Sequence, residues 1–259
     1  MVLVSSTKLY YNPLNISFLP ILTVSPMQIV FSAEKVVRVL LWIVAFLTIA
    51  NTLGQISHHF FGHSRLFGLV HLFNLNREWS IPSFYASFAV LFCSLLLTLI
   101  AWVHHRRGEV DFKYWYGLAV IFLLLAIDEY TDIHNRIFEP VHSQLKAIGL
   151  ISYAWLWVYV PLLFSMLLIY RKFLTRLPKP TAKLFILAGV VYLVGAIGIN
   201  FIGDQYTYSE RREAVSYVVV YTFEELCEML GIVMFIYALL KYMEGYIGRL
   251  ALVFLDREK

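Results

Sequence analysis

Six long apolar stretches constrain what this chain of 259 residues can fold into. Each is about as long as the 20 or so residues that a helix needs to cross the hydrocarbon core of a bilayer. A helix is required there because backbone polar groups in lipid must pair within the segment. The stretches cover residues 36–56, 81–103, 114–133, 151–170, 184–203 and 215–240. The sequence therefore predicts an all-α, polytopic bundle of six transmembrane helices.

The amino-acid composition agrees with a membrane protein. Of all residues, 60% are hydrophobic and 15% are charged, whereas a typical soluble domain has about 25% charged residues. This composition excludes a disordered chain and argues against a water-soluble globule. Two cysteines are too few for a disulfide framework. A net charge of +4 is too small to indicate nucleic acid as a partner.

The basic residues indicate the orientation of the six predicted spans. If the N-terminus lies in the cytoplasm, fifteen of the 21 Lys and Arg residues fall in cytoplasmic segments and six in outer loops. Cytoplasmic loops of membrane proteins carry an excess of Lys and Arg. The sequence therefore predicts a six-helix bundle with both termini in the cytoplasm.

The two ends of the chain differ from the predicted membrane domain. Three prolines interrupt the apolar residues 9–31, and proline breaks a helix because it lacks a backbone donor and clashes with the preceding turn. This segment also lacks the basic start and the cleavage site of a signal peptide. A natural start at Met27 is an alternative expectation for this end of the chain. We expect a poorly structured or interfacial leader (1–33), a six-span membrane domain (34–243) and a cytoplasmic tail (244–259).

Acidic and amide side chains gather at one depth of the predicted bundle. An ionisable group inside a bilayer is unfavourable by a few kcal/mol, so such groups are commonly paired and functional. Because successive spans run in opposite directions, the polar residues of the first, third, fifth and sixth spans all lie toward the outside. These residues are Asn51, Gln55, His59, Asp128, Glu129, Asp132, Asn200, Asp204, Glu224, Glu225 and Glu228. The pattern predicts one polar site that opens outward, with a structural polar network as the alternative.

The spacing of the acids allows a metal site. Residues three or four apart share a helix face, so we expect Asp128, Asp132 and Asn135 to lie together and Glu224 to stack on Glu228. Carboxylates this close must share protons, meet cations or bind a metal. Helical bundles hold di-iron and di-manganese sites with Glu-x-x-His pairs. Here the two pairs with that spacing are Glu129-x-x-Asp132 and Glu225-x-x-Glu228, and each ends in an acid instead of a histidine.

The donor set leaves the identity of the metal open. Ligation by oxygen alone suits Mg²⁺, Ca²⁺ or Mn²⁺. Zn²⁺ prefers more imidazole, which His59 and His63 could supply if the first helix continues through them. We expect a divalent metal ion as cofactor, with Fe, Mn or Zn as the candidates.

Two short motifs stand at the ends of predicted spans. Residues 73–85 read FNLNREWSIPSFY and lead into the second span, and residues 127–129 read IDE and precede His134. Together these motifs resemble those of a family of uncharacterised bacterial multi-spanning membrane proteins. The resemblance carries no established activity, and it implies a shared site in a bacterial cytoplasmic (or thylakoid-type) membrane. The positions that correspond to the family pattern are Glu78, Asp128, Glu129 and His134.

One position departs from that family pattern. Asn135 stands where the pattern has an acid, and Asp132 could replace that acid from the same helix face. His134 points away from the acidic face of a regular helix, so it joins the site only if the helix frays or bends there. The resemblance nevertheless implies that His134 belongs to the site.

These observations favour a membrane-embedded, metal-dependent enzyme at the outer face, a hydrolase or a di-metal oxidoreductase. Its substrate would be a lipid or another apolar small molecule. Glu224 and His134 would be the catalytic residues, with Glu224 as the general base. The expected metal ligands are Asp128, Glu129, Asp132, His134, Glu225 and Glu228. Further candidate site residues are His59, His63, Glu78, Asn200 and Asp204.

Two other functions stay open. A cation or proton-coupled transporter would need a path from the site to the cytoplasm, and the inner halves of all six spans are almost wholly apolar. A non-catalytic subunit of a larger membrane complex would use the polar residues only to fix helix packing. The 17% of aromatic residues would then suit contacts with other apolar surfaces.

Overall fold

The computed structural model describes residues 28–30, 32–62, 68–133, 136, 156–208, 215–246 and 251–253, and most of them are helical. The helices are α1 (Ala33–Phe61), α2 (Leu69–Leu72), α3 (Ile81–Arg106), α4 (Phe112–Thr131), α6 (Leu156–Arg176), α7 (Lys179–Leu193), α8 (Asn200–Tyr208) and α9 (Val215–Tyr246). A π-helix, η2 (Val194–Ile199), joins α7 to α8. Two short strands, β1 (Gln28–Val30) and β2 (Ala251–Val253), pair antiparallel.

Four of the described helices are long and apolar enough to cross a membrane, so the chain is an integral membrane protein, as the sequence predicts. The four spans are Ala33–Phe61, Ile81–Arg106, Lys179–Gly203 and Val215–Tyr246. They correspond to the first, second, fifth and sixth predicted spans. The third and fourth predicted spans coincide largely with α4 and α6.

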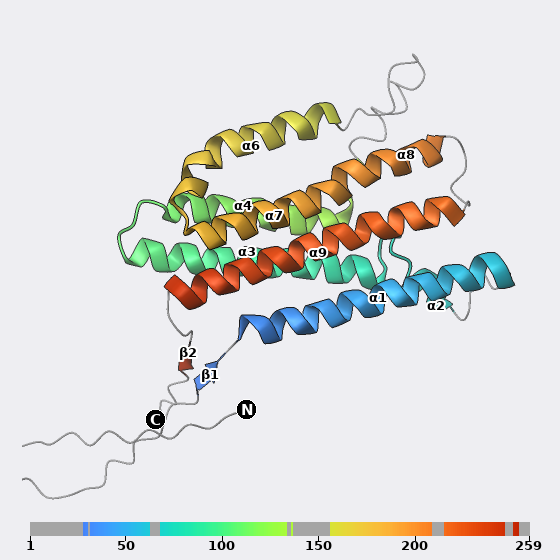
Figure 1. Ribbon diagram of the computed structural model, residues 1–259, viewed down its shortest axis with the longest axis horizontal. Helices are drawn as coiled ribbons and strands as arrows, with labels where there is room; N and C mark the ends of the chain where they lie inside the picture. Colours follow the sequence, from blue (N-terminus) through green and yellow to red (C-terminus); the bar gives the residue numbers. More distant parts are fainter. Residues whose placement is uncertain are drawn as a thin grey trace, which may run out of the picture.

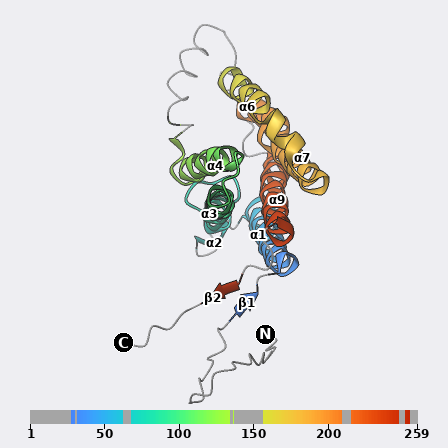
Figure 2. The ribbon, with the colours of Figure 1, turned by 90° about the vertical axis from the view of Figure 1, so that its left-hand side faces the viewer.

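The helices lie side by side, with α9 at the centre of the bundle (Figure 1). The pair α3 and α4 packs on one side of α9, α1 lies on another side, and α7 with η2 lies on a third, while α6 is outermost (Figure 2). The strands lie beyond one end of the bundle, which we name the β end, and α2 and α8 lie at the opposite end, which we name the α2 end.

A tightly packed apolar core joins α3, α4 and α9. Its largest buried side chain is the indole of Trp115, which lies 4.9 Å from the ring of Tyr242, centroid to centroid. Further along the same helices, the rings of Phe122 and Phe235 stack at 4.7 Å. The side chains in this core that are fully buried include Cys93, Leu97, Ile100, Trp115, Ile236 and Leu239. Burial of apolar surface between helices does not itself favour association in lipid, so close packing of this kind must hold the bundle together.

The outward faces of the helices are apolar as well. Trp42 of α1 is 72% exposed and Phe88 of α3 is 73% exposed. In water such exposed apolar side chains would promote aggregation, but in a bilayer they contact acyl chains. The surface therefore agrees with the membrane location.

Glycines allow two close approaches between α9 and the α7–η2 segment. A Cβ on Gly231 would lie 2.8 Å from the backbone nitrogen of Tyr192, and a Cβ on Gly195 would lie 2.7 Å from the carbonyl oxygen of Glu224. Neither position leaves room for a side chain. Small residues of this kind let backbones approach in membrane bundles, so these two glycines fix the crossing of α9 with its neighbour.

Charged side chains connect the helices at the β end. Arg176 of α6 donates to Asp111 at 2.5 Å. Lys241 of α9 forms ion pairs with Glu34 of α1 and with Glu244, the latter at 2.9 Å. The pair Glu34–Lys241 links the start of α1 to the last turns of α9.

The turn between α3 and α4 is also attached to α9. The imidazole Nδ1 of His104 faces Glu109 Oε2 at 2.7 Å, and its Nε2 lies 2.8 Å from the hydroxyl of Tyr242. The hydroxyl of Tyr246 donates to Glu109. This hydrogen bond, together with the nearby His104, holds the pKa of Glu109 below its usual value.

The predicted leader and tail fall largely outside the described residues. Within the described parts, β1 belongs to the leader and β2 to the tail, and they pair with each other in register from Gln28↔Val253 to Val30↔Ala251. α1 begins at Ala33 and α9 continues to Tyr246, each within three residues of the predicted domain boundary.

Candidate functional site

The loop before α3 has a specific local structure. Ser80 caps the helix, since its side chain accepts a hydrogen bond from the backbone N–H of Ser83 at 3.3 Å, and Pro82 occupies the first turn. Both features follow the preferences of helix N-termini. The preceding Trp79 has a φ of 60°, a conformation that is unusual for an aromatic residue. Its ring packs on Tyr130 of α4 at 5.3 Å.

Asn51 attaches this loop to two helices. Its amide donates to the hydroxyl of Thr222 in α9 at 3.0 Å, and its carbonyl accepts from the backbone N–H of Leu75 at 3.2 Å. Asn76 contacts the Tyr217 hydroxyl of α9 at 3.2 Å. The loop is therefore fixed across the α2 end, where it contacts α1, α4 and α9.

The acids of α4 lie at its C-terminal end, and the helix stops there sooner than the sequence predicts. Asp132 has a φ of 54° and forms the C-cap, with its backbone N–H bonded to the Asp128 carbonyl at 2.7 Å. Aspartate tolerates this left-handed conformation better than most residues because its short polar side chain bonds locally. The expectation that Asp128, Asp132 and Asn135 share one regular helix face is therefore wrong for Asp132. Asn135 lies outside the described residues.

The acids of α9 lie in its first half, as predicted. The amide of Asn200, the first residue of α8, donates to Glu224 Oε1 at 2.5 Å. A Cβ on Gly203 would lie 3.5 Å from Glu224 Oε2, so this glycine leaves space beside the carboxylate. Asn200 and Glu224, two of the predicted site residues, are therefore in direct contact.

The carboxylates of α4 and α9 interact with one another through space. Glu225 interacts electrostatically with Glu228, Glu129, Glu224 and Glu78. Glu228 interacts with Glu129 and Glu224, and Glu129 interacts with Glu78, Asp128 and Asp132. The structure thus brings the loop residue Glu78, which the resemblance indicated, into range of the acids of both helices.

The charged groups that act most strongly on three of these acids have the same sign as the acids themselves. Among the described residues, the largest electrostatic influences on Glu129, Glu225 and Glu228 come from other acids. The three side chains are partly exposed. Ionised carboxylates in such a setting repel one another unless a proton or a cation intervenes.

Tyr192 is a site residue that the sequence did not indicate. Its phenol lies within electrostatic range of Glu228, Glu129, Glu225 and Asp128. It stands two residues before the π-helix η2, and π-helical turns inside α-helices are frequent at functional sites. A tyrosine in an apolar span is not itself a signal, because interface anchoring explains most of them.

Other predicted site residues lie elsewhere or cannot be placed. His134 and His63 fall outside the described residues, and the side chain of Asp204 in α8 is not described. His59 lines a cavity between α1 and α9, and none of the predicted acidic ligands lines it. Among the described residues, no group of three or more His, Cys, Asp or Glu side chains is close enough together to hold a metal ion.

Comparison with known proteins gives one match. A family model described as a domain of unknown function (DUF8692) matches residues 36–242, which include the described transmembrane helices almost completely. No curated protein and no solved structure matches the chain. The match agrees with the resemblance to an uncharacterised family.

Proposed function

Since the chain belongs to the DUF8692 family, a domain of unknown function, we propose its function from the site alone. The protein is a membrane-embedded, metal-binding enzyme, a hydrolase or di-metal oxidoreductase. It acts on a lipid or another apolar molecule at one face of the membrane. The observation that carries this proposal is the same-sign charge around Glu129, Glu225 and Glu228, which come from two helices.

A bound cation would offset the repulsion among these carboxylates. Removing an ion from water is unfavourable by several kcal/mol unless an opposite charge compensates. Oxygen donors from facing helices are ligands for divalent metals in helical bundles. A cation between α4 and α9 would draw Glu129 toward Glu225 and Glu228, and Asp128, Asp132 and Glu78 could complete its coordination.

The chemistry at such a site follows from the neighbouring side chains. A bound divalent metal would supply Lewis acidity or a water of lowered pKa. Glu224 would accept a proton, and its hydrogen bond from Asn200 would keep its carboxylate in a fixed orientation. Tyr192 would donate a hydrogen bond to a carboxylate or a substrate oxygen. His134 keeps its proposed role as ligand or acid–base residue.

The orientation of the protein is part of the proposal. Six spans with both termini in the cytoplasm would place the β end inside and the carboxylates outside, in a bacterial cytoplasmic or thylakoid-type membrane. The ends of α3 and α6 support this arrangement, because Arg106 and Arg176 lie at the β end and cytoplasmic ends are rich in basic residues.

The packing of the core argues for an enzyme over a transporter. A cation or proton that left the site toward the β end would meet Leu97, Ile100, Ile236 and Leu239, all of them fully buried. Ion pathways in membrane proteins are lined by polar or ionisable groups. Such a row of apolar side chains favours a site that opens at the α2 end alone.

Metal content is the measurement that tests this function. We expect the protein, purified in detergent without added chelator, to contain Fe, Mn or Zn at a fixed ratio by elemental analysis. The double variant Glu225→Gln/Glu228→Gln should lose that metal, while Glu244→Gln, an acid at the β end, should keep it. Native protein without metal, or metal retained in the double variant, would rule out the proposed site.

The enzymatic part of the proposal has its own test. Metal-loaded protein should convert a component of a membrane lipid extract, detected by mass spectrometry, and the double variant should not. A protein that binds the metal and converts nothing, and that is recovered with constant partners, would favour the subunit of a larger complex.

A further inference from the structure

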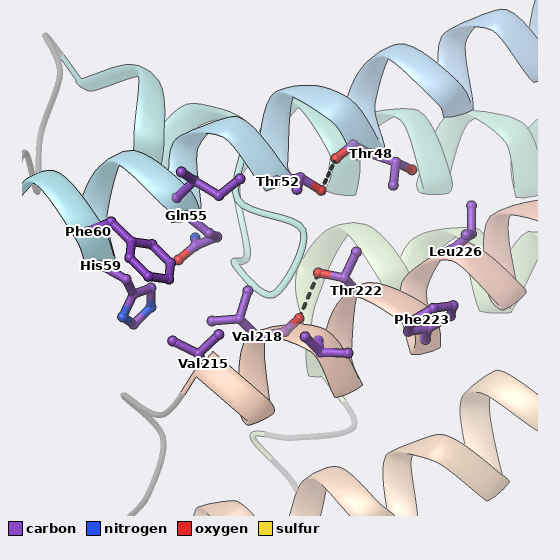
Figure 3. Close-up of a pocket in the computed structure, with 12 residues that line it drawn as sticks. Thr48, Thr52, Gln55, His59, Phe60, Val215, Val218, Thr222, Phe223 and Leu226 are labelled. Atoms are coloured by element: carbon purple, nitrogen blue, oxygen red, sulfur yellow. Dashed lines mark hydrogen bonds between the residues drawn. The ribbon is translucent and has the colours of Figure 1, made fainter.

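A cavity of about 350 Å³ lies between α1 and α9 near the α2 end (Figure 3). Its walls are almost entirely apolar, with Ile56 and Phe60 on one side and Val215, Val218 and Leu226 on the other. Ligand pockets have volumes of about 300–1,000 Å³ and combine apolar walls with a few polar groups. This cavity has the size and the lining of a small ligand pocket, and the acids of the candidate functional site do not contribute to it.

The polar side chain of Gln55 lines the cavity. Gln55 is 8% exposed, and its amide makes no hydrogen bond with any residue that the structure describes. It points from α1 toward Val215 and Val218 of α9 (Figure 3). The amide atoms of Gln55 are not among the fully enclosed polar atoms that lack a partner, and an amide that lines a cavity without such a bond can pair with a group that enters the cavity. In an otherwise apolar cavity it therefore indicates a polar group on a ligand.

The neighbouring threonine hydroxyls do not form a hydrogen bond with the amide of Gln55. Thr52 donates to the carbonyl of Thr48 in its own helix at 2.8 Å. Thr222 donates to the carbonyl of Val218, also in its own helix, at 2.7 Å. Since both hydroxyls donate to backbone carbonyls, the polar groups of the cavity that are available to a ligand are the amide of Gln55 and, toward the end of α1, the imidazole of His59.

The depth of Gln55 indicates which ligand group it meets. No charged residue lies between Arg38 and Gln55, and the 17 residues from one to the other extend about 25 Å along a helix. The hydrocarbon core of a bilayer is about 30 Å thick. Gln55 therefore lies near the boundary of the hydrocarbon, where the ester carbonyls of glycerolipids are found.

The cavity is continuous with the lipid-facing surface of the protein. Val219 and Phe223, which line it, are 49% and 57% exposed, and Ile56 is 42% exposed. These side chains belong to the apolar surface that contacts the bilayer. A membrane lipid can thus enter from the side without leaving the hydrocarbon.

We propose that this cavity binds one glycerophospholipid, with an acyl chain between α1 and α9 and an ester carbonyl that accepts a hydrogen bond from the amide of Gln55. His59, which lines the cavity toward the end of α1 (Figure 3), is then placed near the polar headgroup. The site is separate from the proposed metal site and does not depend on it.

Native mass spectrometry of delipidated protein tests the proposal with two probes. These are a diacyl phosphatidylethanolamine and its dialkyl ether analogue, which has the same chains and headgroup but no ester carbonyl. We expect the diacyl lipid to bind about tenfold more tightly than the ether lipid. The reason is that the hydrogen bond between the Gln55 amide and the ester carbonyl contributes about 1–1.5 kcal/mol. Gln55→Leu should remove this preference.

A second pair of variants tests the location of the site. Val219→Trp should fill the cavity from the lipid-facing side and weaken binding of both lipids by about tenfold or more. Val190→Trp is the matched control, because Val190 is 51% exposed but lies on α7, outside the cavity. Both positions are exposed, so neither variant threatens folding.

Three results would overturn the proposal. The first is equal affinity of the wild-type protein for the ester and ether lipids. The second is unchanged lipid binding in Val219→Trp. The third is that a long-chain isoprenoid quinone competes out the phospholipid at a lower concentration, which would make the quinone the ligand of the cavity.

Discussion

Asp132 combines a backbone role with a proposed ligand role, and the two can be separated by substitution. A left-handed conformation is unfavourable by about 1–2 kcal/mol for most residues but not for glycine. We therefore expect Asp132→Ala to lower the free energy of unfolding by about 1 kcal/mol, whereas Asp132→Gly should leave it unchanged or raise it. Thermal unfolding in detergent measures this difference.

The same two variants should behave alike in metal binding. Both remove the carboxylate, so both should lower metal affinity to the same extent if Asp132 is a ligand. If Asp132→Gly is as unstable as Asp132→Ala, then α4 does not end in the left-handed conformation of Asp132. If both bind metal as the wild type does, Asp132 is not a ligand.

Glu109 gives the protein a pH-dependent contribution to stability. Its pKa is lowered in the folded protein, chiefly by the hydroxyl of Tyr246, so its ionised form favours folding. This contribution is complete above the unfolded-state pKa of about 4.3 and is lost as the pH falls through the lower folded-state pKa. Wild-type protein should therefore lose thermal stability below about pH 4.3, and Glu109→Gln should lose less over the same range.

Tyr246→Phe is the control for this prediction. It removes the donated hydrogen bond but leaves the carboxylate in place. Its pH profile should lie between those of the wild-type protein and Glu109→Gln. Identical acid profiles for all three proteins would show that Glu109 makes no such contribution.

At the scale of helices, the crossing of α7 and α9 depends on Gly231. A methyl group there would meet the backbone of Tyr192 at 2.8–2.9 Å, and backbone atoms cannot move aside as a side chain can. We expect Gly231→Ala to lower the free energy of unfolding by about 1–3 kcal/mol. It should also weaken metal binding, because Tyr192 and the carboxylates of α9 would separate.

Gly189 of α7 supplies the matched control. A Cβ at this position meets no atom within 4 Å. Gly189→Ala should therefore be neutral, or stabilising by about 0.5–1 kcal/mol because alanine favours the helix. Equal changes of stability in the two variants, measured by thermal unfolding, would contradict the close packing assigned to Gly231.

The helices themselves could be predicted from the sequence to within a few residues at most ends. Apolar length identifies a span directly, and Ser80 with Pro82 marks the start of α3. The end of α4 at Thr131 and the π-helix η2 were not predictable. The end of α4 and the position of η2 depend on the conformation of single residues and on contacts with α9. A pattern of apolar residues gives no information about either of these.

At the scale of the whole molecule, polarity is divided between the two ends of the bundle. Fully buried apolar side chains such as Ile100 and Leu239 fill the bundle next to the β end, and ion pairs such as Arg176–Asp111 lie at the β end itself. The interacting carboxylates of α4 and α9 belong to the α2 end. Within the described residues, this arrangement is the one that we expect of a protein whose polar site has access from one side.

This division also explains how far the candidate site could be predicted. The acids of α4 and α9 were identifiable because ionisable groups are rare in membrane spans. Tyr192 was not, because only the approach of Gly231 and Gly195 to their neighbouring helix brings it to the carboxylates. Gln55 was identifiable as a polar residue, but its place in an apolar cavity required the packing of α1 on α9.

The most direct test of the metal site is anomalous diffraction from crystals grown with Mn²⁺. A cation at the proposed site predicts an anomalous peak bounded by the carboxylates of Glu129, Glu225 and Glu228, with metal–oxygen distances of about 2.0–2.6 Å. An anomalous map without a peak between these carboxylates, at a Mn²⁺ concentration that saturates the protein in solution, would contradict the account.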